Sequence, residues 1–148
     1  MQLDSCNKDI FILGAFNLMS RRDSNDVEWQ NVKKRIKKRD KNRCRLCEIM
    51  TIKEFLLFQK SHPVNTGLDP AHCLPVSTHP SLCYVDKNIY SLCRTHHTRI
   101  DDFISPITGN ACSMNRHYWY WWRIINRSSE DYNKETDYEE LVKSFLEN

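Results

Sequence analysis

Two short motifs, far apart in this chain, carry the residue types that bind a soft divalent metal. Cys44-x-x-Cys47 offers two thiolates, and Cys93-x-x-His96 offers a thiolate and an imidazole. Zinc is held tetrahedrally by Cys and His ligands, commonly in two such closely spaced pairs. We therefore predict that these four residues bind one structural zinc ion, which would join two distant turns. The alternative is a disulfide or a set of unrelated buried thiols.

A second histidine, His97, directly follows the last of these ligands. The residues between the two pairs include His72 and Asn88, and zinc binding would hold them as a loop and hairpin over His97. Because the structural ion does not need this extra histidine, His97 is available for chemistry. The opposite register, in which His97 binds zinc and His96 faces the second site, stays open.

The elements that must position these residues can be predicted from periodicity and turn signals. Residues 27–39 are predicted to form a helix, because Trp29, Val32 and Ile36 recur at helical spacing and Asp26 is a suitable N-cap. The bases of this segment fall on its other faces.

The hairpin that carries His72 is predicted from the next signals along the chain. Residues 68–75 are expected to form a strand that ends at Pro75, and residues 88–93 return the chain to the metal. A helix is expected from about Thr95, and its helical spacing places four residues on one face: His97, Ile100, Asp101 and Ile104.

Composition limits the class of protein. With 148 residues the chain fits one domain, and none of its apolar runs approaches the length of a membrane span. The apolar stretch 10–18 lacks a basic leader, so we do not expect a signal peptide. Seven cysteines without such a signal favour an intracellular, metal-binding protein over a secreted disulfide-bonded one.

Charge is distributed unevenly along the chain. Residues 33–45 carry nine bases against the single acid Asp40, whereas residues 128–148 carry seven acids against two bases. A dense basic stretch beside a metal site indicates a polyanionic partner, most simply nucleic acid. A solvated helix face is the alternative explanation.

Taken in order, these motifs resemble the HNH endonucleases, which are ββα-metal (His-Me finger) nucleases. The resemblance covers about residues 27–104 and rests on four elements in sequence: Cys44-x-x-Cys47, His72 in Ala-His-Cys-Leu-Pro, Asn88 in Asn-Ile-Tyr-Ser-Leu-Cys, and Cys93-x-x-His96-His97. It implies a small stand-alone member of the kind common in phages, which would act in the cytoplasm of the host cell.

The resemblance also implies an α+β fold with a zinc-stapled ββα-metal finger, preceded by a basic helix and followed by helices. Residues 1–26 would be an N-terminal extension, residues 27–104 the nuclease core, and residues 105–148 a helical extension of the same domain. The implied activity is metal-dependent hydrolysis of DNA phosphodiester bonds to 5′-phosphate and 3′-hydroxyl ends.

The resemblance assigns a role to each residue of the second site. His72 would be the general base that activates water, oriented by a backbone carbonyl or by Asn88. Asn88 would hold the loop or coordinate the catalytic ion, and His97 would be a ligand of that ion, Mg²⁺ or Mn²⁺. Asp101, four residues after His97, could orient the His97 imidazole.

The sequence departs from the family pattern at two positions. His96 stands where the family usually has the second cysteine of the pair, and a Cys3His zinc site is chemically ordinary. Ala71 precedes the proposed base, where the family often has an Asp or His that binds the catalytic ion. Asp69 is the residue we expect to supply the missing oxygen ligand.

DNA contacts are expected from the basic segment, through Lys37, Arg39, Arg43 and Arg45. A second candidate surface combines the aromatic run 118–122 with three arginines, although these aromatic residues are better explained as a cover for the small core. The arginines are Arg116, Arg123 and Arg127.

Two other classes of function compete with the nuclease. A non-catalytic zinc-binding, nucleic-acid-binding protein is the main alternative, and the departure at Ala71 favours it. A zinc deaminase also combines Cys pairs with His but needs His-x-Glu, and His72 is followed by Cys73-Leu74. The deaminase is therefore disfavoured.

Overall fold

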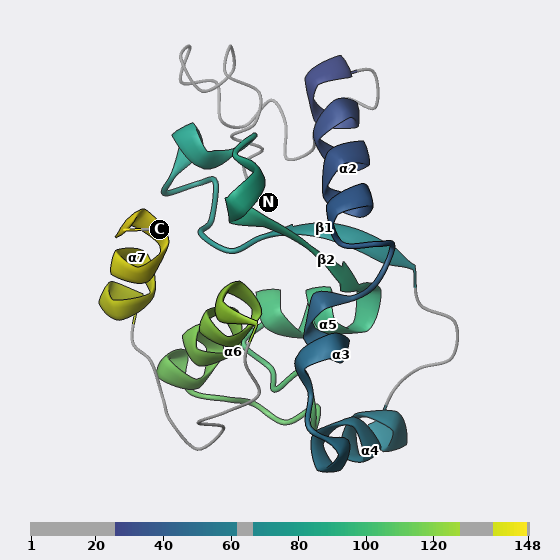
Figure 1. The fold of residues 1–148 in the computed structure, drawn as a ribbon. Coiled ribbons are helices and arrows are strands. Elements are labelled where there is room, and N and C mark those ends of the chain that lie inside the picture. Colours follow the sequence, from purple (N-terminus) through teal and green to yellow (C-terminus); the bar gives the residue numbers. More distant parts are fainter. Residues whose placement is uncertain (1–25, 62–66, 128–137, 148) are drawn as a thin grey trace.

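The computed structural model describes residues 26–61, 67–127 and 138–147, with side chains as far as residue 143 in the last stretch. The fold is α+β, as predicted: a two-stranded antiparallel sheet surrounded by helices (Figure 1). The helices are α2 (Val27–Arg39), α3 (Arg45–Ile49), α4 (Ile52–Ser61), α5 (Arg94–Asp101), α6 (Met114–Asn126) and α7 (Tyr138–Glu147). None of them is long and apolar enough to cross a bilayer.

The hairpin lies at the centre of the molecule. Strand β1 (Leu68–His72) pairs with β2 (Ile89–Cys93), so that Leu68 faces Cys93 at one end and His72 faces Ile89 at the other. Two short 3-10 turns, η2 (Pro80–Leu82) and η3 (Asp86–Asn88), lie in the loop between the strands. Because α5 follows β2 without a linker and packs on both strands, the described chain contains a contiguous β-β-α unit.

Helix α2 forms as its sequence predicts. The Asp26 side chain accepts a hydrogen bond from the Trp29 backbone N–H, which caps the helix. Trp29, Val32 and Ile36 are buried and form a small core with Ile89 of β2, while α2 stands on the opposite side of the hairpin from α5 (Figure 1). The basic residues of this helix therefore surround an apolar stripe that anchors it to the sheet.

The larger core lies between the hairpin, α3 and α6. Trp119, Tyr120 and Trp121 are buried in it, which confirms that the aromatic run mainly covers the core. Arg123 is also fully buried and bonds both carboxylate oxygens of Glu54, at 2.8 and 2.9 Å. The hypothesis that Arg123 contacts phosphates is therefore wrong, because its guanidinium is used to join α6 to α4.

The apolar residues 55–58 are compatible with a strand or a helix in sequence, and the structure shows that they lie in α4. Thr51 and Glu54 cap α4 reciprocally, each side chain accepting from the other residue's backbone N–H. At the other end of the chain, α7 buries Leu141 against the core. The pattern Thr136-Asp-Tyr-Glu139 resembles a capping box that would open this helix, and Thr136 lies outside the described residues.

Candidate metal centre and the neighbouring histidines

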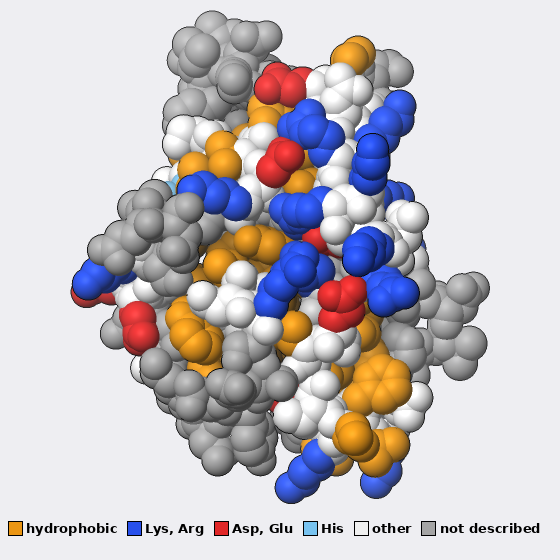
Figure 2. All heavy atoms as spheres, viewed as in Figure 1, with side chains coloured by type: hydrophobic (Ala, Val, Ile, Leu, Met, Phe, Trp, Pro, Cys, Tyr) orange, Lys and Arg blue, Asp and Glu red, His pale blue; other side chains and the backbone are white. Residues whose placement is uncertain are grey.

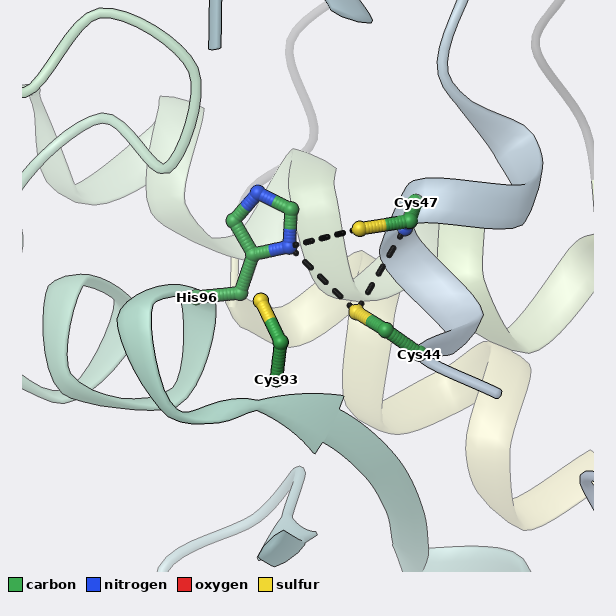
Figure 3. Close-up of side chains that lie close together, drawn as sticks. All are labelled: Cys44, Cys47, Cys93 and His96. Carbon is green, nitrogen blue, oxygen red and sulfur yellow. Dashed lines mark hydrogen bonds between the residues drawn. The ribbon is translucent and has the colours of Figure 1, made fainter. Parts of the chain in front are cut away.

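The four predicted zinc ligands come together in space (Figure 3). Cys44 and Cys47 lie at the start of α3, Cys93 ends β2, and His96 lies in the first turn of α5. One ligand atom from each residue lies within 4.8 Å of all the others. His96 Nδ1 is 3.3 Å from Cys44 Sγ and 3.6 Å from Cys47 Sγ. The residues are thus positioned to hold a metal ion, consistent with structural zinc.

The electrostatics of the cluster also favour a bound cation. Contacts with the sulfurs of Cys44 and Cys93, of which Cys44 has the larger effect, hold the pKa of the Cys47 thiol far above its usual range. Contacts with the sulfurs of Cys44 and Cys47, of which Cys44 has the larger effect, hold the pKa of the Cys93 thiol far below its usual range. Three thiolates cannot share this space without a compensating positive charge, and a soft divalent ion supplies one.

The alternatives left open for these residues are excluded by the geometry. Cys44, Cys47 and Cys93 are free thiols rather than members of a disulfide. His96 is fully buried and faces the sulfurs, whereas His97 points elsewhere. The opposite register of the two histidines is therefore wrong.

His97 lies between two carboxylates. Its Nδ1 is 3.2 Å from Asp69 Oδ2 on β1, and its Nε2 is 3.2 Å from Asp101 Oδ2, one turn further along α5. Burial alone would lower the pKa of His97. The contacts with Asp101 and, to a lesser extent, with Asp69 have the larger combined effect and raise this pKa above its usual value. Asp101 therefore has the orienting contact that the sequence predicted.

Asp69 is shared between His97 and Arg94. The Arg94 guanidinium lies 3.1 Å from Asp69 Oδ1, and 66% of its side chain is exposed. Burial raises the Asp69 pKa, but Arg94 and then His97 lower it more. Ala71, two residues along the same strand, is buried and offers no ligand.

These contacts do not assemble a second metal site by themselves. Within the described part of the chain, the sulfur-rich cluster is the single group of three or more His, Cys, Asp or Glu ligands. The prediction that Asp69 and His97 hold a catalytic Mg²⁺ or Mn²⁺ therefore stays a prediction.

His72 lies at the end of β1, where the sequence placed it. Its Nε2 is 2.9 Å from the backbone carbonyl of Cys83, and its ring stacks on Trp29 of α2 at 5.6 Å between centroids and 17° between planes. A carbonyl only accepts, so Nε2 carries the proton and Nδ1 is the basic nitrogen of the neutral ring. These contacts involve α2 and the inter-strand loop, whereas those of His97 involve β1 and α5.

Asn88 holds the inter-strand loop. It is fully buried, its Oδ1 accepts from the Leu74 backbone N–H at 2.8 Å, and its Nδ2 donates to the carbonyls of Leu74 and Leu82 at 3.2 and 3.3 Å. Of the two roles predicted for Asn88, the structure thus favours loop holding. A buried oxygen that already serves the backbone is poorly placed to bind an ion.

The predicted DNA-contacting bases divide into two groups. Arg45 is buried, pairs with Asp40 at 3.2 Å and donates to the Ile124 carbonyl at 3.0 Å, so its assignment to DNA contact is wrong. Arg39 is half-buried and donates to the Ile89 carbonyl. Lys37 and Arg43 stay exposed, among other Lys and Arg side chains that gather over α2 (Figure 2).

Sequence reasoning missed Asp40, which organises these arginines. Its carboxylate is 2% exposed, accepts from Arg39 and Arg45, and also accepts from the Ser91 backbone N–H at 2.8 Å. This residue therefore ties α2 and α3 to β2. A lone acid within a run of nine bases was the available signal.

Comparisons of this chain with protein-family models, with curated proteins and with solved structures found no match.

Proposed function

We propose that the chain is a metal-dependent endonuclease of the HNH type that hydrolyses phosphodiester bonds in DNA. The observation that carries this proposal is the setting of His72. His72 is the last residue of the first strand of a β-β-α unit, and its ring donates to the Cys83 carbonyl in the loop between the strands. The buried Asn88 side chain bonds the backbone of the same loop.

The contacts of His72 are compatible with a general base. With Nε2 donating to the Cys83 carbonyl, the lone pair is on Nδ1, which can take a proton from water. Stacking on Trp29 restricts rotation of the ring. General-base catalysis of this kind contributes about 10²–10⁴-fold to rate.

The donors around His97 are of the right type for a hard divalent ion. Asp69 and His97 would hold Mg²⁺ or Mn²⁺, which when bound would neutralise charge on the scissile phosphate, and Asp101 would orient the His97 ring from its other nitrogen. Arg94, exposed beside Asp69, adds a positive charge at the same edge of the hairpin. Alanine at position 71 cannot bind an ion. In this proposal Asp69, which lies on the same face of β1, provides the oxygen ligand instead.

The basic face of α2 supplies contacts to the nucleic-acid backbone. In the described part of the chain no contact orients its exposed lysines toward a base edge, so they favour phosphate contacts that do not depend on sequence. The exposed bases on and beside α2 are Lys34, Arg35, Lys37, Lys38, Lys41 and Arg43, of which Arg35 pairs with Asp86.

A non-catalytic zinc protein that binds nucleic acid is the competing function. The burial of Ala71, together with the pairing of both His97 nitrogens to carboxylates of the chain, favours it. Such a protein would use the same basic face and the same metal centre without cutting.

A cleavage assay separates the two functions. Supercoiled plasmid and labelled duplex, nicked and branched DNA are incubated with the full chain in Mg²⁺ or Mn²⁺, beside His72→Ala and a control, His79→Ala. His79 lies in the same loop but contacts Tyr138, so its removal should leave cutting intact. We expect wild type and His79→Ala to cut and His72→Ala to lose activity, with ends that ligase can rejoin. DNA binding without cutting by any of the three proteins contradicts the nuclease.

A further inference from the structure

The orientation of the His96 ring in the metal centre is unusual. Its Nδ1 points at the sulfurs of Cys44 and Cys47, and its Nε2 points away from them (Figure 3). That Nε2 is buried and, within the part of the chain that the structure describes, has no hydrogen-bond partner. The ring nitrogen opposite a bound metal normally donates to a carboxylate, carbonyl or water, which orients the ring and raises its basicity.

An apolar side chain packs against a face of the His96 imidazole. Phe58 of α4 is 2% exposed, and its ring centroid is 4.1 Å from that of His96, with 31° between the planes. The two rings are in close, tilted contact, so that Phe58 covers a face of the imidazole rather than accepting from its N–H. Water is excluded from that face.

We infer that His96 binds the ion through Nδ1 and that Phe58 is the cover that retains the ion in the centre. A neutral imidazole bound through Nδ1 must carry its proton on Nε2. Because no acceptor within the described residues holds that N–H, the ligand keeps its orientation by packing. Loss of the packing surface should therefore release the ion faster, even though Phe58 is not a ligand.

Helix α4 is held firmly enough to serve as a cover. Glu54, one turn before Phe58, forms the buried ion pair with Arg123 and takes part in the reciprocal cap with Thr51. The Arg99 guanidinium lies 5.9 Å above the Phe58 ring, on a side chain that also donates to the Ser61 carbonyl. The cover is thus fixed at both ends of α4, to α6 and to α5.

The ligating atom can be tested by NMR on the zinc-loaded full chain with isotope-labelled histidine. We expect His96 to show a directly bonded proton on Nε2 that exchanges slowly with water, and a metal-shifted Nδ1. A proton on Nδ1, with Nε2 as the coordinated nitrogen, would overturn the inference. The measurement does not depend on nuclease activity.

The cover can be tested by the rate at which a chromogenic chelator removes zinc. Phe58→Ala is compared with Phe55→Ala, which truncates the same residue type on the same helix at a site 38% exposed. We expect release about tenfold or more faster from Phe58→Ala and close to the wild-type rate from Phe55→Ala. Equal rates for the two variants would show that Phe58 is not a cover.

A milder pair of variants keeps the test decisive if Phe58→Ala does not fold, as judged by circular dichroism. Phe58→Leu retains most of the apolar volume but not the flat ring surface, and Phe55→Leu is its control. Faster release from Phe58→Leu than from Phe55→Leu supports the cover, and equal rates oppose it.

Discussion

The metal centre and the two histidines outside it, His72 and His97, differ in how completely the fold assembles them. At the metal centre four ligand atoms lie within 4.8 Å of one another, although they come from turns far apart in the chain. His72 and His97 are instead held by different elements: His72 by α2 and the inter-strand loop, His97 by Asp69 and Asp101.

The difference indicates that the metal centre serves the fold, whereas the contacts of His72 and His97 position single side chains. The three thiols and the imidazole are positioned to hold one ion that would join α3 to β2 and α5, which is consistent with a structural metal site. The histidines are positioned by hydrogen bonds and packing that hold without an ion. Perturbations of the metal centre should therefore disturb the whole fold, whereas perturbations of the supporting contacts should disturb one histidine at a time.

Removal of the ion has the largest expected effect. Structural zinc sites contribute about 10 kcal/mol or more to folding, so chelation or Cys44→Ser should unfold the β-β-α unit. Thermal melts followed by circular dichroism, with and without chelator, measure the loss. Cys112→Ser is the matched control, because Cys112 is a free thiol outside the cluster. A chain that melts at the same temperature with and without chelator would show that the centre is not structural.

Asp40→Asn should give the next largest effect, because it leaves the buried Arg45 without its buried anionic partner and with Glu48 only at 4.0 Å. Loss of one member of a buried pair costs about 3–5 kcal/mol, measurable by urea unfolding. Burial raises the Asp40 pKa, but Arg39, the Ser91 N–H and Arg45 together lower it below its usual 3.8.

The sign of the pH dependence follows from that lowered pKa. The stability that Asp40 contributes is fully present above the unfolded-state pKa near 3.8 and is lost as the pH falls through the folded-state pKa. The gap in unfolding free energy between wild type and Asp40→Asn should therefore be constant near neutral pH and shrink in acid. A gap that widens as the pH falls contradicts this account of Asp40.

Asn88→Ala should disturb the loop beside His72 and leave the metal centre intact. It leaves the buried Leu74 N–H unsatisfied and releases the loop, at a cost of about 2–3 kcal/mol. We expect zinc content, measured by a colorimetric assay on the folded protein, to be unchanged, while plasmid cutting falls as it does in His72→Ala. If zinc content falls with activity, the two regions are not separable in the way proposed.

The sequence was most informative where residue type alone determines the contact. The spacing of Cys44, Cys47, Cys93 and His96 predicted the centre, because few environments other than a metal site bring such residues together. The stripe of Trp29, Val32 and Ile36 likewise predicted the buried face of α2. In both cases the pattern is local and its physical consequence is the same in many folds.

The sequence was least informative where a charged side chain has two possible partners. Arg45 and Arg123 were assigned to nucleic acid, yet both are buried, because Asp40 and Glu54 approach them from elsewhere in the fold. Periodicity identifies which face of a helix is apolar. It does not identify a buried base whose acidic partner comes from another element.

The basic face of α2 gives the smallest expected effect and tests its proposed role in binding nucleic acid. In each of two matched sets the variants remove one positive charge: Lys37→Gln and Lys41→Gln on or beside α2, and Lys53→Gln and Lys60→Gln on α4. All four lysines are exposed. The dissociation constant of a labelled DNA duplex is measured by fluorescence anisotropy against salt concentration, without divalent ions so that no cutting occurs.

Each phosphate contact contributes about 0.9 to the slope of log affinity against log salt on duplex DNA. We therefore expect the slope to fall by about this amount in each α2-side variant and to stay near the wild-type value in the α4 variants. Equal losses in both sets would mean that DNA responds to net charge alone. In that case α2 would be a solvated helix face, and the surface that brings DNA to His72 would have to be sought elsewhere.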